Sequence, residues 1–122
     1  MTVPLVPYVN DADLQLFVGD ALEVLRDLPS ESVRACVTSP PYLDTRPEYD
    51  SPTVQHFADI FEQLARVVTD GCLVNVGRIW RKGVEQLWWT DLIHAASHSG
   101  WALVDTLVWI KPNANPIHGA IL

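Results

Sequence analysis

A short turn, Ser39-Pro40-Pro41-Tyr42, carries the residue types best suited to chemistry in this sequence. Each proline lacks an amide hydrogen, fixes its own φ angle and restricts the residue before it to extended geometry. The turn is therefore stiff and rich in hydrogen-bond acceptors, because the Ser39 hydroxyl and the Pro40 carbonyl can both point outward. Tyr42 offers a flat apolar face beside these two acceptors.

This set of groups suits an exocyclic amino group on a nucleic-acid base. Such a nitrogen is a poor nucleophile, because its lone pair is delocalised into the ring. Two acceptors on its hydrogens draw the nitrogen toward tetrahedral geometry, and stacking holds the ring with about 1–3 kcal/mol per base. A sulfonium methyl group placed in line could then be transferred to a base that has left its duplex. The alternative is a proline-stiffened loop with a packed tyrosine, and four residues alone do not separate the two.

The hydrophobic pattern places this turn at the end of a strand. Residues 33–38 are apolar with no charge after Arg34, which predicts a strand buried on both faces, as in a parallel sheet. Strands and helices alternate in the order β-α-β-α-β-α-β, which predicts an α/β fold. The strands are expected at 14–18, 33–38, 72–76 and 101–110. The helices are expected at 20–28, from a cap at Ser51 or Thr53 to Asp70-Gly71, and at 84–99, after a loose leader at 1–13.

Ligands of open α/β sheets bind just beyond the carboxyl ends of the strands. The turn at 39–42 is such an end, and so are Gly19-Asp20, Gly77-Arg78 and Lys111-Pro112-Asn113. Four polar strand ends on one edge predict a binding crevice.

Composition limits the classes of protein that fit. A hydrophobic fraction of 48% excludes a fully disordered chain, whereas a net charge of −7 has the wrong sign for a self-sufficient DNA binder. Cys36 and Cys72 lie in apolar runs, which predicts reduced core residues. His94 and His98 are four apart on an expected helix, but with no third ligand near in sequence a metal site is disfavoured. With no apolar run of transmembrane length and no leader peptide, we expect a cytoplasmic protein.

Four segments of the chain resemble, in the same order, motifs of the DNA amino-methyltransferases that modify cytosine N4 or adenine N6. They are Phe17–Leu25, Val37–Tyr42, Asp70–Gly77 and the Trp-x-Lys-Pro strand end in Thr106–Asn113. Fewer than forty residues precede the Ser-Pro-Pro-Tyr motif, and none forms a Gly-x-Gly loop. The order is therefore similar to the permuted class, which begins with its catalytic half. It disfavours methyltransferases of RNA or protein, whose glycine-rich loop lies upstream.

The resemblance implies a Rossmann-like methyltransferase fold over residues 14–122, with an incomplete, mostly parallel sheet and flanking helices. It implies S-adenosyl-L-methionine as cofactor and double-stranded DNA as substrate, in a restriction-modification setting. The residues implied to hold the target amine and base are Ser39, Pro40, Pro41 and Tyr42. Serine at the first motif position favours cytosine N4 over adenine N6, which remains the alternative.

The resemblance also gives roles to polar residues outside the motif, each with a structural alternative. Asp20 and Thr38 are implied on the cofactor side, although Asp20 suits a helix cap equally well. Lys111 and Asn113 are implied on the target-base side, or form a plain strand-end turn. The residues implied to meet DNA phosphates, or else to form a solvated loop, are Arg78, Arg81 and Lys82.

The Phe-x-Gly-x-Gly cofactor loop and the target-recognition region of these enzymes have no counterpart in the sequence. We therefore expect a truncated or split form, assisted by a complementing chain that carries the cofactor loop and the basic residues. Strands left without their neighbours would expose unpaired edges. The alternative from another class is a non-catalytic remnant or interaction fragment, which would not bind the cofactor.

Overall fold

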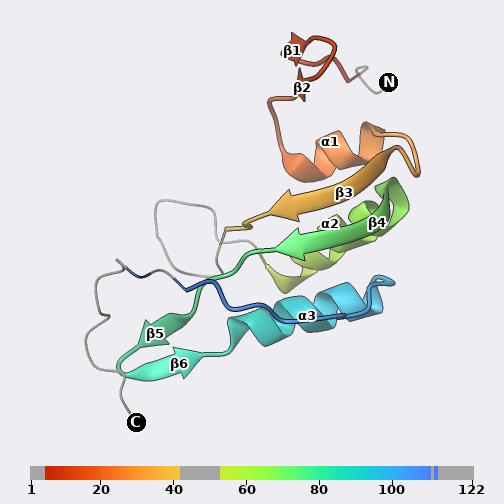
Figure 1. Cartoon of the computed structure of the whole chain (residues 1–122). Helices are drawn as coiled ribbons and strands as arrows, with labels where there is room; N and C mark the ends of the chain where they lie inside the picture. Colours follow the sequence, from red (N-terminus) through yellow and green to blue (C-terminus); the bar gives the residue numbers. More distant parts are fainter. Residues whose placement is uncertain (1–4, 42–52, 111, 113–122) are drawn as a thin grey trace.

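The computed structural model describes residues 5–41, 53–110 and 112 of the 122-residue chain. In chain order its elements are β1 (Val9–Asn10), β2 (Gln15–Leu16), α1 (Ala21–Asp27), β3 (Val33–Thr38), α2 (Val54–Val67), β4 (Val68–Val74), β5 (Ile79–Arg81), β6 (Val84–Gln86) and α3 (Trp88–His98). Among the described residues these strands form three pairs: β3 and β4 are parallel, and β1–β2 and β5–β6 are antiparallel (Figure 1).

The centre of the fold is the β3–α2–β4 unit. The strand β3 has the bounds predicted from the sequence, and its residues from Val33 to Thr38 pair with β4 from Val68 to Val74. Parallel strands need a crossover, and α2 supplies it. Helices α1 and α3 both pack against α2. The predicted α/β class is confirmed, and β3–β4 is the described part of its parallel sheet.

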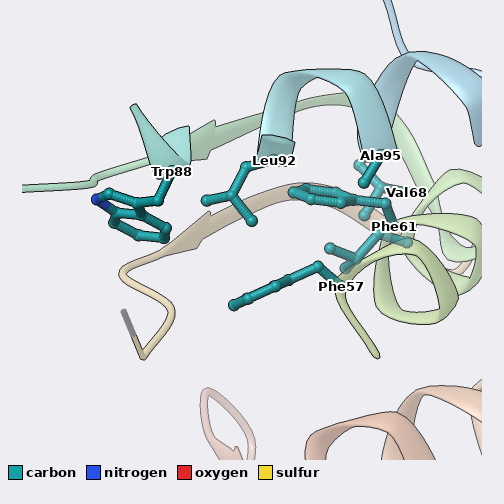
Figure 2. Packing of buried hydrophobic residues seen from close by; sticks show 7 residues of the cluster. Phe57, Phe61, Val68, Trp88, Leu92 and Ala95 are labelled. Atoms are coloured by element: carbon teal, nitrogen blue, oxygen red, sulfur yellow. The ribbon is translucent and has the colours of Figure 1, made fainter. Parts of the chain in front are cut away.

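The core lies where α2 meets α3. Thr53 caps α2, and its hydroxyl accepts the His56 amide hydrogen at 3.1 Å. The apolar residues of α2 recur at helical spacing and therefore share one face. That face meets α3 and the start of β4 in a cluster of buried side chains (Figure 2). The cluster consists of Phe57, Phe61, Leu64, Val68, Trp88, Leu92 and Ala95.

One arginine fixes α1 to α2. The guanidinium of Arg66 donates to the backbone carbonyls of Leu25, at 2.7 Å, and Leu28, at 2.8 Å. The last carbonyls of a helix have no partner within it, so these bonds satisfy part of the end of α1. The orientation of α1 against the central unit therefore depends on a contact between side chain and backbone.

The predicted leader at 1–13 is wrong over its last five residues. Val9 and Asn10 pair with Gln15 and Leu16, and the strand expected at 14–18 is reduced to that pair. The carboxylate of Asp11 accepts the amide hydrogens of residues 13 and 14 at 2.9 and 2.8 Å. Such an Asx turn reverses the chain without a glycine or proline.

Two predicted boundaries in the middle of the chain are also wrong. The helix α2 ends at Val67, and β4 starts at Val68 rather than at residue 72. The cause is that Val68 and Thr69 are β-branched and favour a strand over a helix. Residues 84–86 form a strand, and α3 begins only at Trp88. The cause is a two-residue hairpin turn, with φ of 50° at Lys82 and 77° at Gly83.

Residues 101–110 form no strand, contrary to the prediction. Trp101 is anchored, since its indole N–H donates to the Phe61 carbonyl at 2.9 Å, but the residues after it pair with no strand in the described part of the chain. A strand without a neighbour has no ladder to hold it. The expectation that both faces of β3 are buried is also wrong, because Val37 is 78% exposed. Within the described ranges, no helix is long and apolar enough to cross a membrane.

Replacing Thr53 with alanine should lower the free energy of unfolding by about 1 kcal/mol, because the first turn of α2 loses its capping acceptor. Thr53→Ser keeps the hydroxyl and is the matched control. Urea unfolding followed by circular dichroism measures both. Equal losses in the two variants would show that the cap does not stabilise α2.

Candidate active site

The end of β3 presents the Ser-Pro-Pro turn. Thr38 is the last residue of the strand, and its carbonyl accepts the Asn75 amide hydrogen at 2.8 Å, one residue past the end of β4. This bond continues the parallel pairing to the point where the turn begins. Ser39 and Pro41 are exposed and Pro40 is half-buried, so the serine hydroxyl is open to a ligand. Tyr42 lies outside the described residues.

Asp20 lies at the same end of the molecule. The helix α1 runs opposite to β3, so its first residue and the last residue of β3 share one end (Figure 1). The Oδ1 atom of Asp20 accepts the amide hydrogens of Leu22 and Glu23, at 2.9 and 3.2 Å, which confirms the predicted helix cap. Asp20 is exposed, and within the described part of the chain its second carboxylate oxygen accepts no hydrogen bond. Asp20 can therefore cap α1 and still accept an outside donor.

The segment after β4 is held by a tryptophan. Trp88, the first residue of α3, is 5% exposed and donates its indole N–H to the Gly77 carbonyl at 3.0 Å. This bond ties the exit of β4 to the core. The predicted strand end Gly77-Arg78 thus lies at the same end as the Ser-Pro-Pro turn, because β3 and β4 point the same way (Figure 1).

The β5–β6 hairpin projects from this end and carries the basic residues. Arg78 makes two hydrogen bonds to the Glu85 carboxylate, at 2.7 and 2.6 Å, and its guanidinium lies 5.6 Å from the Trp80 ring centroid. The hydrogen bonds lower the pKa of Glu85 and raise that of Arg78. Arg81 and Lys82 lie at the exposed tip. The charge of Arg78 is matched locally by Glu85.

The cysteines belong to the sheet and not to the chemistry. Cys36 and Cys72 are opposite each other in the β3–β4 register and pack half-buried against the core, as predicted. Burial, with a smaller contribution from the neighbouring Cys36, raises the pKa of the Cys72 thiol to about 12. A thiol that stays protonated is not a nucleophile at neutral pH. Among the described residues, no three His, Cys, Asp or Glu side chains are grouped to hold a metal.

The structure brings three of the four predicted strand ends to one end of the fold, and the fourth stays untested. Asp20, the turn after Thr38 and Gly77-Arg78 share one end, while Lys111 and Asn113 lie outside the described residues. Two surface hollows of the described part lie elsewhere, one between α2 and α3 and one beside the start of β4. The predicted crevice at the strand ends therefore stays a prediction.

Sequence reasoning missed Glu85 and the hydrogen-bonding role of Trp88. Glu85 becomes the partner of Arg78 only because residues 79–86 form a hairpin. The signal was present: Lys82-Gly83 stands between two short segments of strand-forming residues, which favours a two-residue turn. Trp88 is buried in the core, but nothing in the sequence pattern indicates that its N–H meets the Gly77 carbonyl.

The chain is similar in sequence to known proteins over most of its length. No protein-family model matches the chain. The Type II methyltransferase M.Cfr9I of Citrobacter freundii is 37% identical over 83% of this chain and 47% of its own length. The chain is a homologue of part of the Type II methyltransferases. This confirms the kinship to DNA methyltransferases that the four motifs predicted.

Other Type II methyltransferases support the same assignment. M.SfiI of Streptomyces fimbriatus is 32% identical over 85% of this chain and 32% of its own length, and M.PvuII of Proteus hauseri is 29% identical over 90% and 36%. The chain therefore spans about half, or less, of the length of these curated relatives. A solved structure, PvuII DNA methyltransferase (cytosine-N4-specific), matches with a TM-score of 0.49 and 27% identity over 70% of this chain and 34% of that one.

Replacing Trp88 with phenylalanine keeps an aromatic ring in the core but removes the indole N–H and part of the buried ring volume. We expect the free energy of unfolding to fall by about 2 kcal/mol, because the Gly77 carbonyl loses its donor and a cavity opens in the core. Urea unfolding measures the change. A variant as stable as the parent would contradict the anchoring role assigned to this bond.

Proposed function

We propose that this chain forms the part of a DNA methyltransferase that grips the target base. The reaction is transfer of a methyl group from S-adenosyl-L-methionine to the exocyclic amino group of a flipped base, with cytosine N4 as the first candidate. The observation that carries the proposal is the Ser39-Pro40-Pro41 turn at the carboxyl end of a paired strand, with Ser39 exposed. The kinship to Type II methyltransferases of restriction-modification systems supports it.

The role proposed for this chain in the reaction is to position the base and its amino group. The Ser39 hydroxyl and the Pro40 carbonyl accept the two amino hydrogens, and Tyr42 stacks on the base. The amino lone pair, turned out of conjugation, would then be aimed at the methyl group. S-adenosyl-L-methionine, when bound, would supply that methyl group from its sulfonium, and the sulfur would keep the electron pair of the broken sulfur–carbon bond as the nitrogen–carbon bond forms. Ser39 is not needed as a base, because the methylated amine is cationic on formation and releases its proton readily.

The residues present fit one side of a cofactor site. The second carboxylate oxygen of Asp20 suits a donor such as the amino group of an adenine, and Thr38 lies at the same end of the molecule. A Phe-x-Gly-x-Gly loop is absent from the sequence. We infer that a complementing polypeptide supplies the remaining contacts to the cofactor.

Contacts to DNA are assigned to the β5–β6 hairpin. Arg81 and Lys82 at its exposed tip would meet phosphates, which position a protein on the duplex without reading sequence. Arg78 is braced by Glu85 and Trp80, so it would stiffen the hairpin and contribute less net charge. Lys111 and Asn113 are proposed on the target-base side. The net charge of −7 requires that most of the positive surface come from the complementing part.

Replacing Ser39 with alanine tests the proposed grip on the amine. In the methyltransferase reconstituted from this chain and a complementing half, S39A should bind S-adenosyl-L-methionine with unchanged affinity. Methyl transfer should fall by roughly 10²–10³-fold, the loss typical of one positioned hydrogen-bonding group. Titration calorimetry measures binding, and transfer of a labelled methyl group to DNA measures turnover.

The matched control for this variant is Ser32→Ala, since Ser32 lies at the other end of β3 and bonds only the Pro29 carbonyl in the described part of the chain. Unchanged methylation by S39A would sink the role assigned to Ser39. Absence of cofactor binding by the reconstituted pair would favour the non-catalytic alternative.

Two variants of Asp20 separate its role as a cap from its role toward the cofactor. Asp20→Asn retains a capping oxygen, so its stability should stay within about 0.5 kcal/mol of the parent, while Asp20→Ala should lose about 1 kcal/mol. Loss of the charged acceptor in Asp20→Asn should weaken cofactor binding by about tenfold. Parent-like cofactor affinity in Asp20→Asn would show that Asp20 only caps α1.

A further inference from the structure

The tip of the β5–β6 hairpin holds a lysine in a backbone conformation that lysine rarely adopts. Lys82 has a φ of 50° and Gly83 a φ of 77°, and Arg81 pairs with Val84 directly beside them. Positive φ at both positions gives a turn that asparagine followed by glycine suits best. In this region a Cβ atom comes close to the following carbonyl oxygen, and asparagine offsets that cost by a local hydrogen bond. Lysine therefore makes the turn less stable than asparagine would.

The hairpin that carries this strained turn is short. Its strands β5 and β6 pair over three positions, and a hairpin of two strands is marginally stable by itself in water. The root of the hairpin is fixed, because Ile79 packs against the core and the Gly77 carbonyl accepts the Trp88 indole N–H at 3.0 Å. The tip lies beyond these two contacts, where side chains of the hairpin itself can stabilise it.

Glu85 makes such a contact between the two sides of the hairpin. It lies opposite Trp80 in the register, and its two carboxylate oxygens accept hydrogen bonds from the Arg78 guanidinium at 2.7 and 2.6 Å. The Glu85 side chain is 18% exposed, and the guanidinium lies 5.6 Å from the Trp80 ring centroid. A bidentate pair of this kind is stronger and more directional than a single ion contact. The Arg78–Glu85 pair, called the brace below, therefore joins the residue before β5 to the middle of β6.

The strain at Lys82 indicates a use for its side chain. Strained backbone conformations persist where surrounding contacts maintain them, and they are frequent at ligand sites. Asparagine would relax the turn but carries no charge, whereas the ammonium group of an exposed lysine can pair with a phosphate as a point charge. A strained lysine at the tip and a brace at the root of the same hairpin are both explained if the tip binds an anion.

We propose that Glu85 is a positioning residue that strengthens the binding of DNA by this hairpin. Through Arg78 it offsets the strain of the turn and keeps Lys82 in place to meet a phosphate. The charge of Glu85 alone would weaken binding to DNA, which is itself an anion, so the two effects have opposite signs. The inference rests on the proposed function only in naming DNA as the ligand, and the brace itself stands on contacts within the hairpin.

The first test measures hydrogen exchange of amides 79–86 in this chain by mass spectrometry. The double variant R78Q/E85Q removes the brace and leaves the net charge at −7, and exchange should become about fivefold faster. The matched control is R34Q/D70N, which removes the exposed Arg34–Asp70 ion pair of 2.8 Å at the other end of β3 and β4. The control should exchange as the parent does. Equal exchange in R78Q/E85Q and the parent would overturn the proposal.

The second test measures the affinity of the reconstituted methyltransferase for duplex DNA by fluorescence anisotropy. R78Q/E85Q should bind about fivefold more weakly, because affinity falls with the fraction of molecules in the binding conformation. Arg78→Lys keeps the charge but loses the bidentate fork, so it should weaken binding to a similar extent. R34Q/D70N should bind as the parent does, and affinity for S-adenosyl-L-methionine should be the same in all of these variants.

Glu85→Gln gives the sharpest outcome, because position and charge predict opposite results. It removes an acid close to the DNA and should still weaken binding. Tighter binding of DNA by Glu85→Gln than by the parent, or parent-like binding by Arg78→Lys, would overturn the proposal.

Lys82→Asn separates the order of the turn from its charge. The turn relaxes, so exchange at 79–86 should slow about fivefold. Loss of one phosphate contact should lower the slope of log affinity against log salt by about 0.9. Added to R78Q/E85Q, Lys82→Asn should restore the slow exchange of the parent but not its affinity for DNA. Faster exchange in Lys82→Asn, or an unchanged salt slope, would contradict the proposal.

These measurements also separate this inference from the proposed function. A parent enzyme that binds DNA but transfers no methyl group removes the proposed function, and the affinities of the variants still test the brace. Methyl transfer by the parent, with parent-like DNA affinity in the brace variants, removes this inference and keeps the function. A reconstituted enzyme that binds no DNA removes both.

Discussion

The parallel pairing of β3 with β4 is the constraint on which the rest of the molecule depends. Five of the six residues of β3 are held in register by β4, and the bond between the Asn75 amide and the Thr38 carbonyl extends that register one residue further. The prolines at 40 and 41 can then end the strand at one fixed place. A serine hydroxyl on a free loop would sample many directions, whereas here it follows directly from a paired backbone. The pairing in the sheet and the packing of α2 offset the conformational entropy lost when this backbone is ordered.

The other elements bring further polar groups to that same end. The connection through α2 makes β3 and β4 point the same way, and α1 returns its capped first residue to the end of β3 (Figure 1). Arg66 and Trp88 hold these pieces through backbone carbonyls rather than through charge pairs. The result is an edge with an acceptor-rich turn, a carboxylate and a basic hairpin. We propose that this edge positions a base and contacts one side of a cofactor.

The sequence allowed prediction of the parts whose cause is local. The bounds of β3 follow from an apolar run closed by Ser39-Pro40, and the buried face of α2 follows from the spacing of its aromatic and aliphatic residues. The position of Ser39 was predictable because proline has no amide hydrogen to donate to the ladder of a central strand, so two consecutive prolines are not expected inside one. The cap at Asp20 was predictable because an aspartate directly before a helix accepts amide hydrogens of its first turn.

The predictions that were wrong concern segments whose structure depends on partners distant in the sequence. Residues 101–110 have strand composition, but a strand exists only when another pairs with it, and none of the described strands does. The hairpin at 79–86 was missed because Val84 and Leu87 also fit the helical spacing of α3. The bond between Arg78 and Glu85 follows from that hairpin and could not be predicted without it.

We propose that this chain grips the amino group of a cytosine. Mass spectrometry of nucleosides from DNA treated with the reconstituted methyltransferase and S-adenosyl-L-methionine identifies the base that is methylated. N4-methylcytosine is the expected product. Methylation found only at adenine N6, or no methylated base despite a formed complex and bound cofactor, would contradict it.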